Sequence, residues 1–479
     1  MTAAVAAEAQ AAGECLCFAF PHATGCVESM VSPSDTIAAL ATPVGTAALA
    51  LIRLSGPRSE ALAGEIFGKT PLPRRVHHAD YHDRAGALVD EVLFTFFRAP
   101  HSYTGEDSLE ISCHGNPFIA QKILEDLFSR GCRPAGPGEF TERAFLHGRM
   151  DLSQAEAVMD LIQARSERAL AAAHRQLRGA LGRQMQELID TLLALIARIE
   201  AYIDFPDEDL PPEDESWVRR DLAKLSRATD RLLTTSHYGE MLRQGAKVVI
   251  VGAPNAGKSS LLNRLLGRER ALVSAEPGTT RDFLEEPAIL GPHCIRLIDT
   301  AGLNPSPAAI ERLGIEKTLE CAHDADLLLL VLDATRPCPA LPETLSARLT
   351  PAGALVVMNK IDLAPEIVAA APVGLDSVAV SALTGDGIEL LGAAMAGKIE
   401  ALCLGLGDDA IAINARHAHA LEQAKASLAS AQDKLAAHDP AELLASDLRD
   451  VLEAFGQISG KVDNERMLDQ LFAAFCIGK

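Results

Sequence analysis

Short apolar runs separated by turn-forming residues mark the first third of the chain. These runs cover residues 48–56, 91–97 and 109–115, and Pro, Gly and His residues stand between them. Apolar runs of this length with such boundaries are typical of strands. The pattern predicts an α+β domain over residues 31–148.

A helical periodicity replaces this pattern after residue 150. Ser153 and Glu156 match the S-x-x-E capping box, which predicts that a helix begins there. From this point to about residue 205, apolar residues recur at spacings of three and four, so we expect one long helix or two. An acidic, Pro-containing stretch follows and is expected to be a solvated loop. Helical patterns resume over 217–243 and again from about 401.

The segment between these helical patterns alternates apolar strand-like runs with segments of helix length. This alternation is typical of βαβ units with a parallel sheet. We therefore predict an α/β domain over 245–400, inserted into a helical domain made of 149–244 and 401–479. The predicted strands are KVVIVG, CIRLIDT, LLLLVLD, ALVVMNK and SVAVSA.

A phosphate-binding loop follows the first of these strands. The sequence GAPNAGKS at 252–259 fits G-x-x-x-x-G-K-[ST] and precedes a helical pattern, which is the context that the motif requires. Its backbone N–H groups and the helix N-terminus suit phosphate. We expect Lys258 to reach the β- and γ-phosphates and Ser259 to bind Mg²⁺. The expected nucleotide contacts here are Asn255, Ala256, Gly257, Lys258, Ser259 and Ser260.

Two later motifs predict further phosphate and magnesium contacts. DTAG at 299–302 ends a predicted strand, so Asp299 is expected to hold Mg²⁺ through water and Gly302 to donate its N–H to the γ-phosphate. In PGTTRD at 277–282, either Thr279 or Thr280 can be the switch threonine, and we choose Thr280 as the Mg²⁺ ligand. The next residue after DTAG is Leu303, which cannot orient water as the Gln of Ras-type enzymes does.

The sequence NKID at 359–362 predicts the choice of base. Asp362 can accept hydrogen bonds from the N1–H and the exocyclic amine of guanine, and adenine has no matching donors. Asn359 and Lys360 belong to the same motif. Ser381, Ala382 and Leu383, at the end of another predicted strand, are expected to support the base. Four motifs in this order, each at a strand end, predict a domain that binds and hydrolyses GTP.

Composition narrows the possible partners. The net charge of −21 and the aromatic content of 4% argue against a protein that grips long nucleic acids unaided, because such binding depends on Lys, Arg and aromatic stacking. A nucleic-acid substrate would need a local basic patch or a basic partner. The ten Cys residues show no zinc-site spacing and indicate a reduced, cytoplasmic location, and no apolar run reaches the ~18 residues of a membrane span.

The first 30 residues are Ala-rich and poor in Arg. They match neither a signal peptide nor a transit peptide. We expect residues 1–30 to be a disordered leader, or to precede a true start at Met30.

Longer motifs run through the remainder of the chain. They are DTIAALATP from residue 35, PHSYTGEDSLEISCHG at 100–115, PGEFTERAFLHGRMDLSQAEAVMDLI at 137–162, the phosphate loop, PGTTRD, DTAG followed by IERLGIE, and CIGK at 476–479. Together they resemble the MnmE (TrmE) family of tRNA-modification GTPases from about Asp35 to Lys479.

The resemblance implies a fold, partners and a reaction. It implies a multidomain chain with an α+β folate-binding N-terminal domain, an all-α helical domain and an inserted α/β P-loop GTPase domain. The chain would form a homodimer through its N-terminal domains and a heterotetramer with the FAD-dependent protein MnmG. Together they would add a carboxymethylaminomethyl or aminomethyl group at C5 of the wobble uridine of certain tRNAs. The one-carbon unit would come from 5-formyl- or 5,10-methylene-tetrahydrofolate.

The resemblance also assigns residues for GTP hydrolysis. Glu311 in IERLGIE matches the family's catalytic glutamate and would orient the attacking water in place of the missing Gln; the alternative is an ordinary helix-surface glutamate. Asn255 matches the asparagine through which the family binds K⁺. Ser274, Glu276 and Thr279 fall where further K⁺ ligands lie, the first two through backbone carbonyls.

For folate, the matching positions are Arg53, Glu110, Arg149 and Lys479. Glu110 could pair with the pterin N–H edge while the cations suit the glutamate tail, although surface ion pairs are an alternative interpretation. Cys476 is either a nucleophile toward uridine or folate, or a packed small apolar residue. His114 is expected to be structural.

Two other functions remain open from sequence. One is a ribosome-assembly GTPase switch, which the single phosphate loop and the acidic balance disfavour. The other is a folate-dependent aminomethyl carrier in which GTP only regulates.

Overall fold

The computed structural model describes residues 35–204, 216–269, 285–300, 319–364, 370–404, 410–460, 468, 471–473 and 475–478. These residues divide into two units by their contacts. The N-terminal unit contains the described residues up to 159, together with 182–185 and those from 456 onward. The central unit contains 160–181 and the described residues from 186 to 455.

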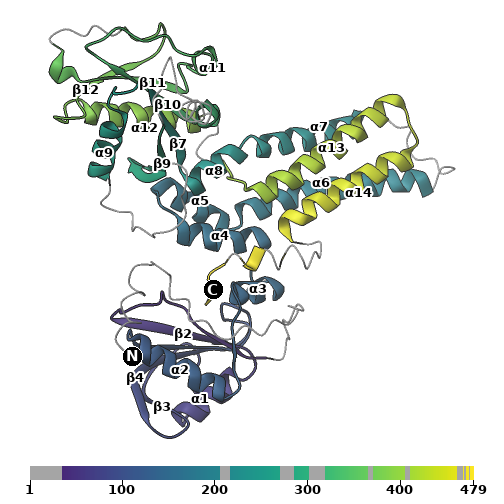
Figure 1. Ribbon diagram of the computed structural model, residues 1–479. Helices are drawn as coiled ribbons and strands as arrows, with labels where there is room; N and C mark the ends of the chain where they lie inside the picture. The colour runs from purple at the N-terminus through teal and green to yellow at the C-terminus, as the bar shows by residue number, and fades with distance from the viewer. Residues whose placement is uncertain are drawn as a thin grey trace, which may run out of the picture. The chain divides into compact units, whose positions relative to one another are not determined.

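A six-stranded sheet with strand order β3-β4-β5-β2-β1-β6 forms the N-terminal unit (Figure 1). Helices α1 (Ser59–Phe67) and α2 (Pro117–Ser129) pack on one face, where they bury Leu62 and Ile123. Helix α3 (Glu139–Leu146) places Phe140 in a smaller apolar cluster with Ile37 of β1. The strands are β1 (Ile37–Leu40), β2 (Leu49–Ser55), β3 (Val76–His82), β4 (Leu88–Phe97), β5 (Ser108–His114) and β6 (Arg133–Pro134).

The alternation along β2 presents two charged positions to each other. Ile52 and Leu54 enter the core beneath α1 and α2, so the intervening Arg53 points to the opposite face of the strand. Arg53 pairs in register with Glu110 of β5 and with Ala39 of β1. This face of the sheet therefore carries an arginine and a carboxylate side by side.

The residues just before 479 complete the N-terminal unit. Ile477 forms a bridge with Pro137, and the Gly138 N–H donates to the Cys476 carbonyl at 3.3 Å. Gly138 has φ 66, a conformation that favours glycine, and an added Cβ would lie 2.8 Å from the Phe475 Cβ. Phe472 and Phe475 pack with Leu152 in a common apolar cluster.

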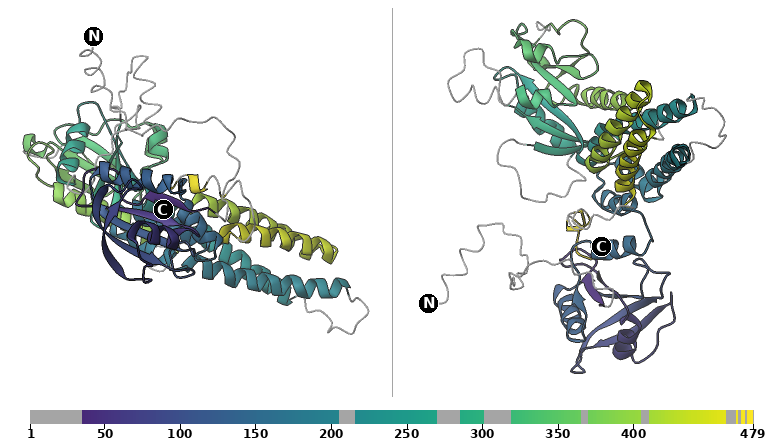
Figure 2. Two further views of the ribbon diagram at one scale, coloured as in Figure 1. Left: turned by 90° about the horizontal axis from the view of Figure 1, so that it is seen from below. Right: turned by 90° about the vertical axis from the view of Figure 1, so that its right-hand side faces the viewer.

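Four long helices of the central unit lie side by side in both views of Figure 2. They are α6 (Ala180–Asp204), α7 (Ser216–Leu233), α13 (Ala415–Ala437) and α14 (Ala441–Ser459). Ion pairs join α7 to α13 through Asp230 and Lys425 at 2.7 Å, and α6 to α14 through Glu200 and Arg449 at 2.6 Å. Among the described residues, no helix is both long and apolar enough to cross a membrane.

The expected start of the first long helix was wrong. Helix α4 (Leu152–Gln163) already contains Ser153, and Asp151 caps it instead. The Asp151 carboxylate accepts from the Gln154 N–H at 2.8 Å, and the Gln154 side chain accepts from the Asp151 N–H at 2.9 Å. Two capping boxes overlap in this sequence, D-x-x-Q and S-x-x-E, and the earlier one begins the helix.

The expectation of one helix or two up to residue 205 was also wrong, because three helices occupy this stretch. Ser166 caps α5 (Glu167–Leu177) by accepting from the Ala169 N–H. Gly179, with φ 77, separates α5 from α6. In the same way, the helical pattern over 217–243 is divided into α7 and α8 (Ser236–Gln244), with Thr235 as the cap between them.

A second six-stranded sheet, of order β12-β11-β10-β7-β9-β8, builds the α/β part of the central unit. All neighbouring pairs are parallel except β8 with β9. The edge strand β8 was not predicted, since Glu285, Glu286 and Pro287 interrupt its apolar character. The strands are β7 (Ala246–Gly252), β8 (Glu285–Leu290), β9 (His293–Asp299), β10 (Leu327–Asp333), β11 (Ala354–Asn359) and β12 (Ser377–Val380).

Helices cover both faces of this sheet. Leu261 of α9 (Lys258–Glu269) and Leu391 of α12 (Ile388–Leu404) belong to the core on one face. The core on the other face contains Ala322 and also Leu345, which lies in the short helix α11 (Glu343–Ser346). Strands buried on both faces explain the continuous apolar runs in the sequence.

Candidate functional site

The phosphate loop lies between β7 and α9, as the motif predicts. Asn255 has φ 62 and Gly257 has φ 94. A Cβ on Gly257 would collide with the Asn359 amide nitrogen, so a side chain at this position is excluded by a close neighbour as well as by φ. Helix α9 begins at Lys258, which directs its N-terminal N–H groups toward the loop.

Ser259 and Asp299 meet beside this loop. The Ser259 hydroxyl donates to Asp299 Oδ2 at 2.5 Å, joining the first turn of α9 to the end of β9. Asp299 Oδ1 is buried and has no hydrogen-bond partner among the described residues. A carboxylate with an unused buried oxygen next to a serine hydroxyl suits a hydrated Mg²⁺, which prefers oxygen ligands.

The side chain of Lys258 folds back onto the main chain of the same loop. Its Nζ donates to the carbonyls of Gly252 and Ala253, both at 3.2 Å. Burial lowers the pKa of Lys258, while the nearby Asp299 acts in the opposite direction. The ammonium is thus held where phosphate oxygens would replace the carbonyls.

The base-recognition motif lies at the carboxyl ends of β11 and β12. Asn359 is buried, donates to the Ala256 carbonyl at 2.8 Å and accepts from the Ala382 N–H at 3.0 Å. The Ser381 hydroxyl donates to Asp362 Oδ1 at 2.6 Å. The sequence-predicted residues Asn359, Asp362, Ser381 and Ala382 are therefore neighbours, and Leu383 follows them as an exposed apolar side chain.

Lys360 ties this motif to the phosphate loop. Its Nζ donates to the Asn255 carbonyl and to Asp333 Oδ2, each at 2.7 Å. Asp333 is partly desolvated, which raises its pKa, but hydrogen bonds from Lys360 and Thr335 prevail and lower the pKa to about 2. Sequence reasoning missed Asp333 and Thr335; their position at the end of the strand LLLLVLD was the available signal.

Several predicted residues cannot be placed in this arrangement. The switch threonines Thr279 and Thr280, Gly302, the catalytic candidate Glu311, the K⁺ candidates Ser274 and Glu276, the folate candidate Lys479 and the leader 1–30 lie outside the described residues. Asn255 and Ser260 are described and exposed.

A second cluster surrounds Arg53 in the N-terminal unit. Arg53 donates from Nε at 3.0 Å and from Nη2 at 2.8 Å to the same oxygen, Glu110 Oε1. Its guanidinium lies 5.1 Å from the ring centre of Tyr103 and 5.9 Å from that of Phe140. The two folate candidates Arg53 and Glu110 are therefore joined, and two aromatic rings that the sequence analysis did not single out flank them.

The remaining candidates in this unit differ in their surroundings. Arg149 is exposed and its Cγ lies 3.3 Å from where a Cβ on Gly105 would be, so it is beside the loop that carries Tyr103. Cys476 is exposed, which contradicts its interpretation as a packed apolar residue; its neighbour Phe475 takes the buried position. His114 is exposed and bonds to Asp90 at 2.8 Å.

Comparison with known proteins identifies the family. The model of the MnmE helical domain matches residues 152–476, and that of the GTP-binding protein TrmE N-terminus matches residues 36–149. A protein of Opitutus terrae named tRNA modification GTPase MnmE is 59% identical and covers 93% of this chain and 99% of its own length. The chain belongs to the MnmE family.

A second MnmE protein matches nearly the same share of this chain at lower identity. The tRNA modification GTPase MnmE of Akkermansia muciniphila is 43% identical over 94% of this chain and 100% of its own. Among solved structures, the G domain of the T. maritima FeoB iron transporter is 27% identical, covers 32% of this chain and 98% of that chain, and has a TM-score of 0.24. The family models show an N-terminal TrmE domain and an MnmE helical domain in this chain, and the similar proteins are named as GTPases.

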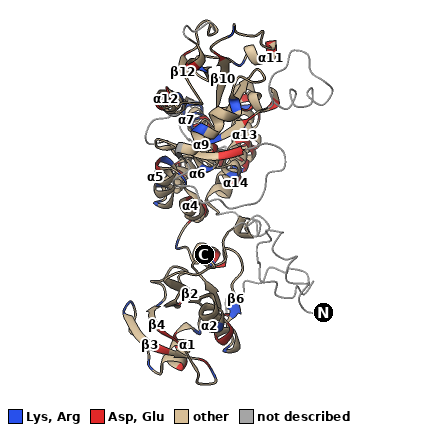
Figure 3. Ribbon diagram, turned by 60° about the vertical axis from the view of Figure 1, so that its left-hand side comes forward, with Lys and Arg blue, Asp and Glu red and all other residues tan. Residues whose placement is uncertain are grey.

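Charged residues of the described chain are distributed over both units. In Figure 3, Lys and Arg positions and Asp and Glu positions both occur in each unit, and β6, which contains Arg133, is prominent among the basic ones. With a net charge of −21, binding of any nucleic acid would have to rely on local groups of cations.

Proposed function

We propose that this MnmE-family enzyme binds GTP with Mg²⁺, hydrolyses it in a K⁺-dependent reaction and uses hydrolysis to support modification of tRNA. The observation that carries the proposal is the meeting of phosphate, magnesium and base residues at the carboxyl ends of β7, β9, β11 and β12. Ligands of open α/β sheets bind at this edge.

Each part of the nucleotide has a proposed partner. Lys258 and the loop 255–257 take the β- and γ-phosphates, and Ser259 with Thr280 ligates Mg²⁺ while Asp299 holds its water. Asp362 takes the guanine edge, supported by the hydroxyl of Ser381 at 2.6 Å. The remaining proposed contacts are Ser260, Ser274, Thr279, Gly302, Asn359, Lys360, Ala382 and Leu383.

Hydrolysis needs a cation and a residue that positions water, because Leu303 follows DTAG. Charge that develops on the phosphates is offset in other GTPases by an arginine finger worth roughly 10³–10⁵ in rate. We propose K⁺ in this role, held by the side chain of Asn255 and by Ser274, Glu276 and Thr279. Glu311 would orient the water.

In the N-terminal unit we propose a site for a tetrahydrofolate, either 5-formyl or 5,10-methylene. Its pterin edge would lie against the Arg53–Glu110 pair, and Arg149 and Lys479 would attract the glutamate tail. A homodimer of this chain would act with the FAD-dependent MnmG on the wobble uridine of certain tRNAs, adding a carboxymethylaminomethyl or aminomethyl group. Cys476 is accessible for a covalent role.

The reaction is tested by nucleoside analysis of tRNA from a strain that lacks this protein. We expect the modified wobble uridine to disappear, to return with the unchanged chain and to stay absent with Asp362→Asn. A flavoprotein should purify with the chain. Normal wobble uridines in the deletion strain, with a defect in ribosomal subunits instead, would favour the ribosome-assembly alternative.

The cation requirement is tested by comparing hydrolysis in KCl and in NaCl at equal ionic strength. We expect fast turnover only in KCl, and loss of the K⁺ response in Asn255→Ala. Equal rates in both salts would rule out a K⁺ ion in the arginine-finger role.

A further inference from the structure

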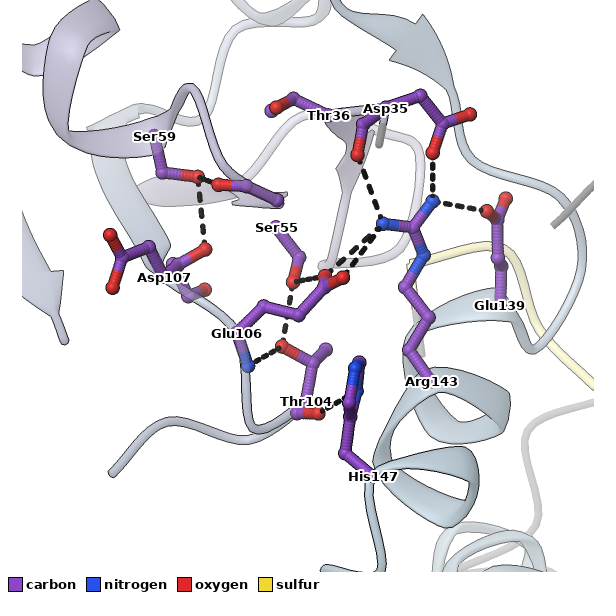
Figure 4. A network of polar contacts seen from close by, with 12 residues as sticks. Asp35, Thr36, Ser55, Ser59, Thr104, Glu106, Asp107, Glu139, Arg143 and His147 are labelled. Atoms are coloured by element: carbon purple, nitrogen blue, oxygen red, sulfur yellow. Dashed lines mark hydrogen bonds and ion pairs between the residues drawn. The ribbon is translucent and has the colours of Figure 1, made fainter. Parts of the chain in front are cut away.

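Arg143 is the centre of an ionic network in the N-terminal unit (Figure 4). Its side chain is 1% exposed and lies among three carboxylates. It donates to Asp35 at 2.5 Å, to Glu139 at 2.9 Å and to Glu106 at 3.1 Å. Arg133 adds a second guanidinium, which contacts Asp35 at 2.8 Å and Glu139 at 2.5 Å.

The network holds two positive and three negative charges, and Arg143 is the member that contacts all three carboxylates. Removal of Arg143 would take away the ion pair that Glu106 makes in the network, whereas Asp35 and Glu139 would keep Arg133. Burial raises the pKa of Glu139, but hydrogen bonds from Arg133 and from the Gly136 N–H outweigh this effect and hold the pKa below its usual value. Buried ion groups seldom add stability compared with apolar packing, and their best-supported use is to fix one conformation.

The network joins two segments that are separate in the sequence, the loop between β4 and β5 and helix α3. Glu106 belongs to the loop between β4 and β5, and it also accepts from the Ser55 hydroxyl at 2.7 Å. The Ser55 and Thr104 hydroxyls are 2.6 Å apart. Glu139 is the first residue of α3. Arg143 is also on α3, so its contact with Glu106 joins the helix to the loop, and its contact with Asp35 joins the helix to the residues before β1.

Each segment brings an aromatic ring to Arg53. Tyr103 precedes Thr104 in the loop, and Phe140 follows Glu139 in α3. The two segments also meet directly, because the hydroxyls of Tyr103 and Thr141 are 2.9 Å apart. Members of the ionic network thus lie close to both aromatic neighbours of Arg53 along the chain: Glu139 directly precedes Phe140, and Glu106 follows Tyr103 by three residues.

We propose that the Arg143 network and the Tyr103–Thr141 hydrogen bond are positioning elements of the ligand site at Arg53 and Glu110. They hold the rings of Tyr103 and Phe140 at the guanidinium, and so fix the direction of the Arg53 side chain. A flat heterocycle could then lie against an aromatic ring while its N–H edge meets Glu110. This inference rests on the proposed folate function of that site.

The hydroxyl pair offers the sharpest test, since its variants keep every charge and ring. Binding of 5-formyl-tetrahydrofolate to the full chain is measured by calorimetry for the unchanged chain, Tyr103→Phe, Thr141→Val and the double variant. We expect each single variant to weaken binding by about five-fold, the factor that a neutral hydrogen bond contributes. The double variant should bind no more weakly than either single variant, because both remove the same bond. Thr141→Ser keeps the hydroxyl and should therefore bind the ligand as tightly as the unchanged chain does.

Glu106→Gln and Asp126→Asn form a matched pair of carboxylate variants. Glu106 contacts Arg143, whereas Asp126 of α2 is paired with Arg130 at 2.7 Å and does not touch the network. Both changes should lower the melting temperature, but only Glu106→Gln should weaken ligand binding. GTP hydrolysis should be unchanged in Asp126→Asn.

The outcomes separate this inference from its premise. If the unchanged chain gives no binding, the proposed folate site and this inference fall together. If it binds, and Tyr103→Phe and Thr141→Val bind equally well, only the positioning role is overturned. If Glu106→Gln and Asp126→Asn weakened ligand binding equally, the network would only stabilise the fold and would have no positioning role.

Discussion

The ammonium of Lys360 donates to the main-chain oxygen of Asn255 at 2.7 Å, joining the base-recognition motif to the phosphate loop. Asn255 has φ 62, in the left-handed region that residues other than Gly adopt only at a cost. Lys360 is itself held by Asp333. The main chain at Asn255, the proposed K⁺ residue, is therefore held by a side chain from the residue that follows β11.

Lys360→Met should impair K⁺ activation because the Asn255 carbonyl loses its donor. We expect the K⁺ concentration for half-maximal hydrolysis to rise by about five-fold or more, the factor of one hydrogen bond, and Asp333→Asn to act in the same direction. Hydrolysis is measured against KCl at constant ionic strength and saturating GTP. Asp324→Asn, at an exposed carboxylate, is the control. An unchanged K⁺ response in Lys360→Met would show that the phosphate loop keeps its shape without this contact.

Asp362→Asn should change the preferred base. The amide can no longer accept both guanine donors, so GTP affinity should fall by roughly 10–100-fold, the scale of one charge-assisted hydrogen bond. Affinity for xanthosine triphosphate should improve, because the amide can donate to the O2 of that base. Competition binding with labelled GDP measures both. Equal GTP affinity in the variant would mean that Asp362 does not read the base.

Glu311→Ala should slow hydrolysis with little change in nucleotide affinity. Water-positioning and general-base residues contribute roughly 10²–10⁴ in rate, so kcat should fall by at least about 100-fold. Single-turnover hydrolysis in KCl provides the measurement, and Glu316→Ala, five residues further along the same segment, is the matched control. Full turnover in Glu311→Ala would remove it from the mechanism.

His293 should make the central unit less stable in mild acid. This residue of β9 is buried between Arg168 of α5 and Glu400 of α12. Burial and the charge of Arg168 lower its pKa, although Glu400 acts against them. A lowered folded pKa means that protonation favours the unfolded chain, so stability falls as the pH drops from about 6.5 toward the folded value.

Thermal unfolding at pH 7.5 and 5.5 tests this linkage. The loss of melting temperature between the two should be smaller in His293→Gln than in the unchanged chain. His323→Gln, at an exposed histidine beside Asp324, should leave the pH dependence as it is. The same loss in all three proteins would assign the acid sensitivity to other groups.

The sequence predicts most clearly what depends on neighbours along the chain. The phosphate loop, the strand-end motifs and the apolar strands of the α/β part were all anticipated, because strand, loop and helix signals there agree over short distances. Local competition explains the errors in helix boundaries. Asp151 and Ser153 are both good caps, and nothing in the local pattern says which one begins the helix.

The Arg143 network could not be predicted in this way. Glu139 and Arg143 are four residues apart on one helix, but Asp35 and Glu106 come from distant parts of the chain. From the sequence alone, a charged residue in an amphipathic helix is predicted to be exposed to solvent, and only the tertiary structure shows that Arg143 is buried. The same holds for Tyr103, whose position beside Arg53 depends on the loop between β4 and β5.

The pairing of Ile477 with Pro137 has a consequence for biosynthesis. The strands and helices of the N-terminal unit leave the ribosome first, but Phe472 and Phe475, which bury the start of α3 and α4, are made after the whole central unit. At roughly 5–20 residues per second, the unfinished unit waits for tens of seconds with apolar surface uncovered. A chaperone that binds nascent chains would have its longest opportunity there, and a message truncated before residue 471 would yield a GTPase part joined to an N-terminal unit without its closing segment.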